Sequence, residues 1–428
     1  MVYTYFKTYQ NLLLKGWKGS RIIIMTNRLS GLDGVRACAS LMIVIHHLSQ
    51  NLHIDGQYMS PNTPFSQLIC MLTFQTGVTV FFVLSGGLLA RPFWKNYFDG
   101  KDMPNIKDFF IRRIARLAPG LYAAFFLGIA IEMFFIPDLP DRFLRIITTL
   151  TFTAGLHYTT FFHTPINTPI WSVSYEFISY VLLAVSMFSL YAFFKKRVPS
   201  SGLTWWGIIL IAVFLLNSVI LTYCQPDDVN RGWQYGLVGG AKYWAPYYNP
   251  IAFFAQYMFG IAAAGVTVYF QKNIELYKRY SASGLFDKLS VMGITGYIFL
   301  MLLFTYLTAG DYEGEWLYGF QHQPYHYPFF TFFAALTVAF LPLSNKIGKM
   351  MDNRFFTFTA KISFGLYIYH FIFLNLVFNL EMPPGTTSVT NWILGCIAVF
   401  AATYGLSYIS WRFLEEPAIR LSKRFLSL

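Results

Sequence analysis

Charged residues are scarce in this chain. They make up 12% of its 428 residues, whereas a soluble globular protein has about 25%. Apolar residues account for 55% and aromatic residues for 20%. No polar segment is long enough to form a soluble domain, so we expect none to be appended. The composition excludes a soluble globular protein and predicts an all-α, polytopic bundle in a lipid bilayer.

Cysteine and repeated sequence are scarce as well. The four cysteines form no CxxC pair, so we expect neither a disulfide framework nor a bound metal. No internal repeat is visible, which gives no support to an inverted-repeat transporter. The first 30 residues contain Lys and Arg without a continuous apolar run, so we expect no cleavable signal peptide. Residues 1–31 are instead predicted to form a cytoplasmic or interfacial amphipathic segment.

Long apolar runs are what the chain has in abundance. Runs of about 20 apolar residues predict about ten membrane-spanning helices, at residues 32–53, 66–90, 117–136, 172–194, 203–223, 249–271, 289–309, 328–345, 361–381 and 391–413. The segment 146–162 is apolar but is broken by threonines, Gly155 and His157. We expect this segment to be interfacial or re-entrant on the outer face.

The positions of the basic residues orient these helices. With both termini cytoplasmic, 27 of the 32 Lys and Arg residues fall on the inner side, four on the outer side and one, Arg36, within a span. This distribution follows the positive-inside rule. We therefore attribute the net charge of +12 to the basic residues that orient the protein in the membrane, and we expect no nucleic-acid partner. We predict a multi-pass protein of the cytoplasmic (inner) membrane, with a transmembrane domain at 32–417 and a basic cytoplasmic tail at 418–428.

The first span carries ionisable residues at membrane depth, where they are functional-site candidates by default. In a helix, Arg36 and His47 lie within about 20° of each other and about 16 Å apart along the axis. Asp33 lies within about 40° of that face, whereas His46 points about 100° away. Alternatively, Arg36 reaches the interface with its head group and His47 is a hydrogen-bonded core histidine.

The fourth span begins with the sequence Trp171-Ser172-Val173-Ser174-Tyr175-Glu176. Because this span begins outside, we expect the Glu176 carboxylate at a level where it could approach His47. A histidine oriented by a carboxylate is a plausible general base. The alternative is that Glu176 is an N-terminal acid favoured by the helix dipole.

The ninth span places further polar residues near mid-membrane. Tyr367 and His370 lie in the run LYIYHFIF. We treat them as candidates to support the site, although His370 could equally be an interface histidine with satisfied hydrogen bonds.

Arginines cluster between the second and third spans, on the inner side. Arg112, Arg113 and Arg116 precede the third span, and Ser85 stands beside Gly86-Gly87 in the second. Positive-inside topology alone explains such a cluster. A guanidinium cluster also suits a phosphorylated cytosolic ligand. The Gly pair permits close approach of another helix or of a ligand.

These features together favour an enzyme that takes a phosphorylated donor from the cytosol and serves an acceptor on the other side. A proton-coupled secondary transporter that uses His47 and Glu176 as a relay is the alternative. A scaffold or flippase-like subunit is a third reading, but it leaves the intramembrane Arg and His unexplained.

Six motifs, in order along the chain, resemble those of the acyltransferase-3 family of integral membrane O-acyltransferases. They are LDGVRACASLMIVIHH, FFVLSGGLL (81–89), RRIARLAP (112–119), WSVSYEF (171–177), ISFGLYIYHF (362–371) and WRFLEEP (411–417). In the first motif an Arg is separated by ten residues from an essential His, which correspond to Arg36 and His47. Gly87, Tyr175 and Phe364 depart from the usual residues, but none of these changes removes a polar group at a motif position.

The resemblance implies transfer of an acyl group, usually acetyl from acetyl-CoA, to a hydroxyl of a surface polysaccharide, lipid-linked glycan or small molecule. On this basis we expect His47 to act as general base or acyl carrier, and Glu176 to orient it or to position the acceptor. Binding of the CoA phosphates is assigned to Arg36, Arg112, Arg113 and Arg116. Supporting or substrate-binding roles are assigned to Asp33, Ser85, Trp171, Ser172, Tyr367 and His370.

Overall fold

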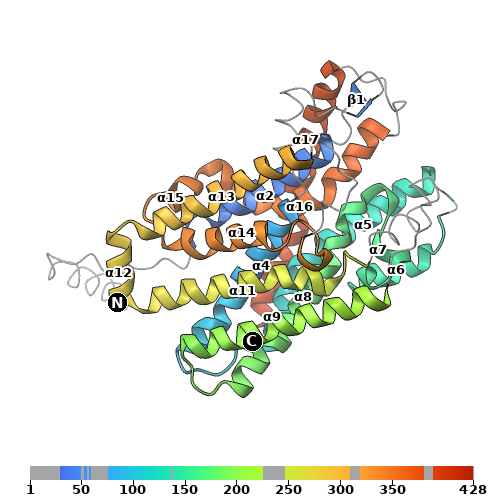
Figure 1. Ribbon diagram of the computed structural model, residues 1–428. Helices are drawn as coiled ribbons and strands as arrows, with labels where there is room; N and C mark the ends of the chain where they lie inside the picture. The colour runs from blue at the N-terminus through green and yellow to red at the C-terminus, as the bar shows by residue number, and fades with distance from the viewer. Residues whose placement is uncertain are drawn as a thin grey trace, which may run out of the picture.

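The computed structural model describes residues 29–49, 53–54, 57–58, 76–135, 137, 139–224, 246–308, 319–379 and 389–427. The predicted amphipathic segment at 1–31 therefore lies almost entirely outside the described residues. Figure 1 shows the described part as a helical bundle. Its longest helices are α2 (Leu32–Ser49), α4 (Gly77–Phe98), α5 (Ile106–Phe135), α8 (Trp171–Phe193), α9 (Pro199–Tyr223), α11 (Pro250–Lys272), α13 (Leu285–Thr308), α14 (Phe329–Phe340), α16 (Arg354–Leu374) and α17 (Val389–Ser410).

These ten helices correspond one to one with the ten predicted spans. Among the described residues, eight helices are long and apolar enough to cross a membrane. The other two are α2, which carries Asp33, Arg36 and two histidines within 18 residues, and α14, which has only 12 residues. The polytopic all-α fold is thus confirmed.

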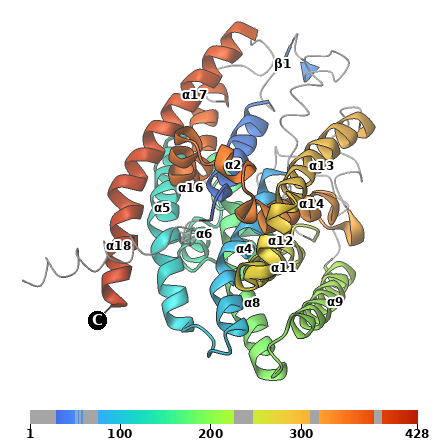
Figure 2. The ribbon, with the colours of Figure 1, turned by 90° about the vertical axis from the view of Figure 1, so that its left-hand side faces the viewer.

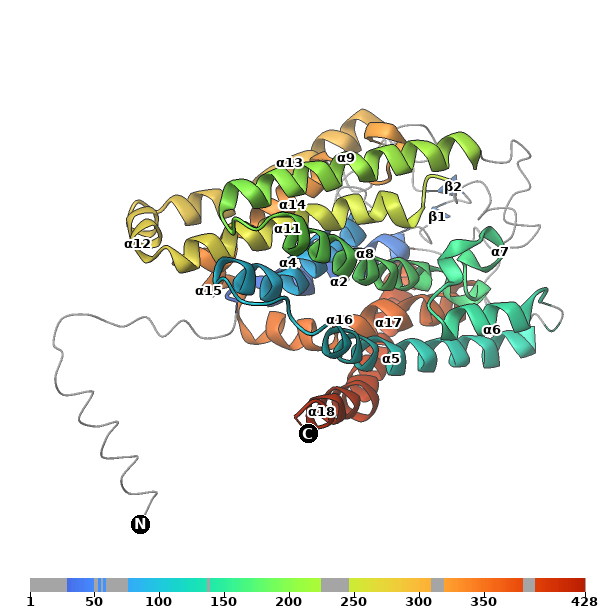
Figure 3. The same cartoon turned by 90° about the horizontal axis from the view of Figure 1, so that it is seen from below.

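Shorter elements connect the long helices. They are the two-residue strands β1 (His53–Ile54) and β2 (Gln57–Tyr58), which pair antiparallel, and α6 (Arg142–Leu150), η1 (Ala154–Leu156), α7 (Tyr158–Phe161), η2 (Pro165–Ile170), α12 (Ile274–Ala282), η5 (Phe320–His322), η6 (Leu341–Leu343), α15 (Ile347–Met351), η7 (Asn375–Asn379), η8 (Trp411–Glu415) and α18 (Glu416–Phe425). Figures 1 and 3 place α12 at one end of the bundle and α6 and α7 at the other. The segment 146–162 is broken into short helices and forms no eleventh long helix.

Helices α4, α11 and α16 form the interior of the bundle. About 70% of the most apolar stretch of each is buried, compared with 17% for α9. Helices α4 and α11 come into backbone contact, because a Cβ atom on Gly86 would clash with the carbonyl of Tyr257 and one on Gly260 with that of Val83. The glycine at position 86 therefore serves the close packing of two helices.

Two helix boundaries differ from the prediction. Helix α5 begins at Ile106, so Arg112, Arg113 and Arg116 lie within a helix and not in the loop before it. At the other end of the chain, α17 continues without a break through the π-turn η8 into α18, which packs against α5. Figure 2 shows α17 and α18 as one long helix along the side of the bundle. Most of the predicted tail is therefore an extension of the last span.

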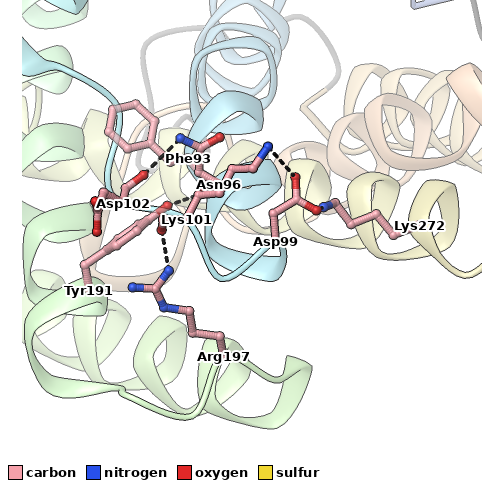
Figure 4. A network of polar contacts seen from close by, with 8 residues as sticks. All are labelled: Phe93, Asn96, Asp99, Lys101, Asp102, Tyr191, Arg197 and Lys272. Atoms are coloured by element: carbon pink, nitrogen blue, oxygen red, sulfur yellow. Dashed lines mark hydrogen bonds and ion pairs between the residues drawn. The ribbon is translucent and has the colours of Figure 1, made fainter.

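A polar network ties together the ends of α4, α8 and α11 (Figure 4). Asp99 forms ion pairs with Lys272, which ends α11, and with Lys101 at 3.9 Å. Arg197, which follows α8, donates a hydrogen bond to the Lys101 carbonyl. The Tyr191 hydroxyl donates to the Phe93 carbonyl at 2.7 Å. These contacts hold the α4–α5 connection against two neighbouring helices.

Candidate functional site

A pocket of about 630 Å³, its open mouth included, lies among α2, α4, α5, α8 and α16. Its polar lining comes from five different helices, so only the folded bundle can assemble it. Six of the predicted site residues line it. These are Arg36, Ser85, Arg116, Ser172, Glu176 and Tyr367, accompanied by Ser363 and the apolar Val78, Phe81, Phe82, Leu117 and Phe364.

The carboxylate in this pocket is held by two hydroxyl donors. Ser85 Oγ, on α4, donates to Glu176 Oε1 at 2.9 Å. Tyr180 lies one turn further along α8, and its hydroxyl donates to the same oxygen at 2.6 Å. Both bonds require an acceptor, which suits the ionised carboxylate. Tyr180 was missed by the sequence analysis, although its i+4 spacing from Glu176 on one helix face is a usable signal.

Arginine charge exceeds carboxylate charge in the pocket. Arg36 and Arg116 line it together with Glu176, and the charges that act on Arg36 include those of Asp33 and Arg113. Arg113 is half-buried, and its Nε atom has no hydrogen-bond partner among the described residues. A pocket with excess guanidinium charge and little carboxylate is suited to an anionic ligand.

The three arginines of α5 are not equivalent. Arg116 lines the pocket, Arg113 is half-buried and Arg112 is exposed. Around the helix axis Arg116 lies between the other two, about 40° from Arg112 and about 60° from Arg113. Helix rotation alone therefore does not separate them, and the helices packed against α5 decide which of them is covered.

His47 and His370 form a hydrogen-bonded pair. The distance from His47 Nδ1 to His370 Nε2 is 2.8 Å, and the two rings stack with centroids 5.0 Å apart. His370 is completely buried. Its Nδ1 lies 2.8 Å from the Tyr367 carbonyl oxygen.

These contacts assign the protons of the neutral pair. A carbonyl oxygen can only accept, so Nδ1 of His370 carries a proton and its Nε2 is an acceptor. His47 Nδ1 must then be the donor of the hydrogen bond between the rings. The lone pair of the neutral His47 ring consequently lies on Nε2, as in a general base oriented through its other nitrogen.

Tyr367 lies between the pocket and the histidine pair. Its side chain lines the pocket, and its ring centroid is 6.2 Å from that of His370. Its hydroxyl is 2.6 Å from Ser172 Oγ and donates to the Pro169 carbonyl. The histidines therefore stand one helical turn beyond the pocket.

Glu176 and His47 occupy different levels of the bundle. Glu176 shares the pocket with Arg36 and Ser85, and His47 is about 16 Å further along α2 than Arg36. The difference arises because α2 begins deep in the bundle. Ser85 lines the same pocket as Arg36, and α4 continues for a further 13 residues beyond Ser85, a distance of about 20 Å. From the predicted span boundaries we expected Glu176 at the level of His47. In the structure, the residue that contacts the His47 ring is His370.

Trp171 belongs to the packing around the site and does not line the pocket. Its ring stacks on Phe161 with centroids 5.3 Å apart and meets Phe253 edge to face. Within the described residues, no group of three or more His, Cys, Asp or Glu side chains could hold a metal ion.

Comparisons with known proteins identify the family of the chain. A family model described as an acyltransferase domain matches residues 29–412, nearly the whole chain. The chain belongs to this acyltransferase family. The match includes both histidines, all the pocket-lining residues and the arginines of α5.

Curated relatives of this family member are named for the same chemistry. The protein named O-acetyltransferase OatA in Staphylococcus aureus strain NCTC 8325 is 24% identical over 400 residues, which cover 91% of this chain and 57% of the relative. OatA of strain COL matches equally well. The chain thus spans little more than half the length of these relatives. No solved structure matches it significantly.

Proposed function

We propose that this acyltransferase is an O-acyltransferase of the cytoplasmic membrane. It moves an acyl group, in the first instance acetyl, from cytosolic acyl-CoA to a hydroxyl of a surface polysaccharide, lipid-linked glycan or other acceptor presented from the outer side. The family and the names of its relatives support O-acetyl transfer. The observation that carries the proposal is the hydrogen-bonded His47–His370 pair, which lies one turn beyond a pocket lined by two arginines.

The charges around the pocket support an acyl-CoA donor. CoA carries phosphate groups, for which guanidinium is the preferred partner. Arg36 and Arg116 line the pocket, with Arg113 beside them and Arg112 exposed on the same helix. The distance of about 16 Å between Arg36 and His47 is comparable to an extended pantetheine arm. The donor would therefore enter with its phosphates at the arginines and its thioester towards the histidines.

The histidine pair can supply the proton transfer that esterification needs. His47 Nε2 takes the proton of the acceptor hydroxyl while the hydroxyl oxygen bonds to the thioester carbonyl carbon. The carbon–sulfur bond then breaks, and the sulfur leaves with the proton as the thiol of CoA. His370 Nε2 accepts the hydrogen bond of His47 Nδ1, which orients the ring and stabilises its protonated form. In the variant mechanism, His47 carries the acyl group itself.

Glu176 has a positioning role in this scheme. Its carboxylate is held by Ser85 and Tyr180 and balances part of the charge of Arg36 and Arg116. We assign it to substrate positioning in the pocket, since the histidine pair lies one level further along the bundle.

The test compares two adjacent histidines. His47→Ala should abolish acetyl transfer by the purified protein in nanodiscs and remove the acetyl ester from cell-surface glycans or lipids in mass spectrometry. His46→Ala is the matched control, because its side chain points about 100° away, and it should keep most of the activity. Thermal stabilisation by CoA should persist in both variants, by about 2.7 kcal/mol at 100 times the dissociation constant. Wild-type transfer rates in a folded His47→Ala protein would refute the proposal.

A further inference from the structure

The segment that precedes α8 is fastened to α16 on both sides of His370. In η2, Asn167 interrupts the helix with φ −145° and ψ 59°, and its Nδ2 donates to the Ile368 carbonyl at 2.8 Å. In return, Asn375 Nδ2 donates to the Ile166 carbonyl at 2.9 Å. We call Asn167 and Asn375 the asparagine clamp.

The clamp is centred on the histidine pair. Ile368 stands two residues before His370, and Asn375 stands five residues after it, where α16 gives way to the π-turn η7. A third helix anchors the same segment, because Glu132 Oε1 on α5 accepts a hydrogen bond from Ile166 N at 3.0 Å. Hydrogen bonds thus connect the part of α16 that carries His370 to residues 166–167, and connect residue 166 to α5.

Asn167 is a buried polar side chain whose hydrogen bonds are only partly satisfied. It is completely buried, and burial of an amide is unfavourable unless its groups are hydrogen-bonded. Its Oδ1 has no hydrogen-bond partner among the described residues, so the side chain is incompletely satisfied. The bond that it does make goes to a carbonyl in the middle of α16, which the helix itself would satisfy without help.

The hydrogen bond between His47 and His370 tolerates only a small rotation of α16. A rotation of α16 by ~20° would move an imidazole that lies ~6 Å from the axis by about 2 Å. Such a shift exceeds the tolerance of the 2.8 Å bond between His47 and His370, because hydrogen bonds beyond about 3.5 Å are lost.

We propose that Asn167 and Asn375 are positioning residues that hold α16 in the rotation and height at which His370 orients His47. They touch neither substrate nor the reacting atoms and act through His370. This inference rests on the proposed function and deepens it, since it assigns a task in the reaction to the segment before α8.

The experiment measures acetyl transfer from acetyl-CoA by the full-length protein in nanodiscs. Asn167→Ala and Asn375→Ala should each lower kcat by about 10- to 100-fold, as misplacement of a catalytic group by about 1 Å does. The KM for acetyl-CoA should stay within about twofold of the wild-type value, because Arg36, Arg116 and Glu176 are untouched. Asn167→Ser keeps a hydrogen-bond donor and should recover part of kcat. It also provides a test if the Asn167→Ala protein does not fold.

The matched control is Asn217→Ala. Asn217 is an equally buried asparagine on α9, whose Nδ2 donates to the Gln321 carbonyl at 3.3 Å and whose Oδ1 accepts from Asn249. Its loss removes two hydrogen bonds, so a fall in Tm is expected with kcat unchanged. A purely structural role for the clamp would make the three Ala variants indistinguishable in kcat.

A double variant separates positioning from stability. In a His370→Ala background, Asn167→Ala should lower kcat by less than twofold, because the residue through which it acts is gone. An undiminished loss in that background overturns the inference. A wild-type protein without any acetyl transfer would instead overturn the proposed function, so the two failures are distinguishable.

Discussion

Two polar networks at different places in the bundle are built from opposite chemistry. Near the ends of α4, α8 and α11, Asp99, Lys101 and Lys272 form ion pairs in contact with water, where the Lys101 side chain is 67% exposed (Figure 4). Around His370, the network consists of amides, hydroxyls and imidazoles, with the Glu132 carboxyl at its edge, in a buried setting. Water can replace the partners in the first network but not in the second.

The difference lies in what a lost partner leaves behind. An exposed ion pair typically contributes about 0–1 kcal/mol, whereas a buried polar group that loses its partner costs about 1–3 kcal/mol. The first network can therefore fasten a loop without defining its geometry closely. The second is able to define the orientation of a ring, which is what the chemistry at His47 needs.

The largest effect is expected at the centre of the buried network. His370→Ala should lower kcat by about 10²- to 10³-fold, because His47 Nδ1 loses its hydrogen bond to His370 Nε2. CoA binding, measured by thermal stabilisation, should remain. Activity near the wild-type level in this variant would show that His47 works without His370 and would break the contrast between the two networks.

A smaller effect is expected from the charge in the pocket. Glu176→Gln keeps an acceptor for Ser85 and Tyr180 but removes the one carboxylate among the pocket-lining residues. We expect kcat/KM to fall by about 10- to 100-fold. Glu275→Gln, an exposed residue of α12, is the control and should leave kcat/KM unchanged. Equal values for the two variants would remove Glu176 from the site.

A buried imidazole before α8 predicts a dependence of stability on pH. Burial lowers the pKa of His163 to about 3, below the unfolded value of about 6.5. The folded protein therefore binds fewer protons than the unfolded chain below pH 6.5, and stability falls as the pH falls through that range. Between pH 7 and pH 5 the loss from this group is about 2 kcal/mol.

The measurement is the pH dependence of Tm in two variants. His163→Gln should remove most of the acid-dependent decline, whereas His157→Gln, whose ring is exposed, should retain it. Parallel pH curves for both would mean that His163 is protonated in the folded state.

The smallest effect is expected in the exposed network. Asp99→Asn should lower the free energy of unfolding by less than about 1 kcal/mol, and added salt should reduce the difference further. A larger loss, comparable to that of a buried polar substitution, would mean that the α4–α5 connection depends on this carboxylate and that the two networks are alike.

Local patterns made much of this molecule predictable. Ten apolar runs predicted ten helices, because a bilayer-spanning helix needs about 20 apolar residues wherever it lies in the bundle. Helix periodicity separated His47 from His46 and placed Arg36 on the same face as His47. Motif spacing identified the family before any tertiary contact was known. Each of these signals is contained in a single segment of the chain.

Tertiary structure decided what surrounds those residues. His47 and His370 are 323 positions apart, and the clamp joins residues about 200 positions apart. Which hydrogen bonds form across such separations depends on the depth at which α2 begins and on the rotation of α5 and α16. Those quantities come from the packing of whole helices, including the backbone contact at Gly86 and Gly260. The sequence by itself therefore determined which side chains are available at each level, and packing decided which of them meet.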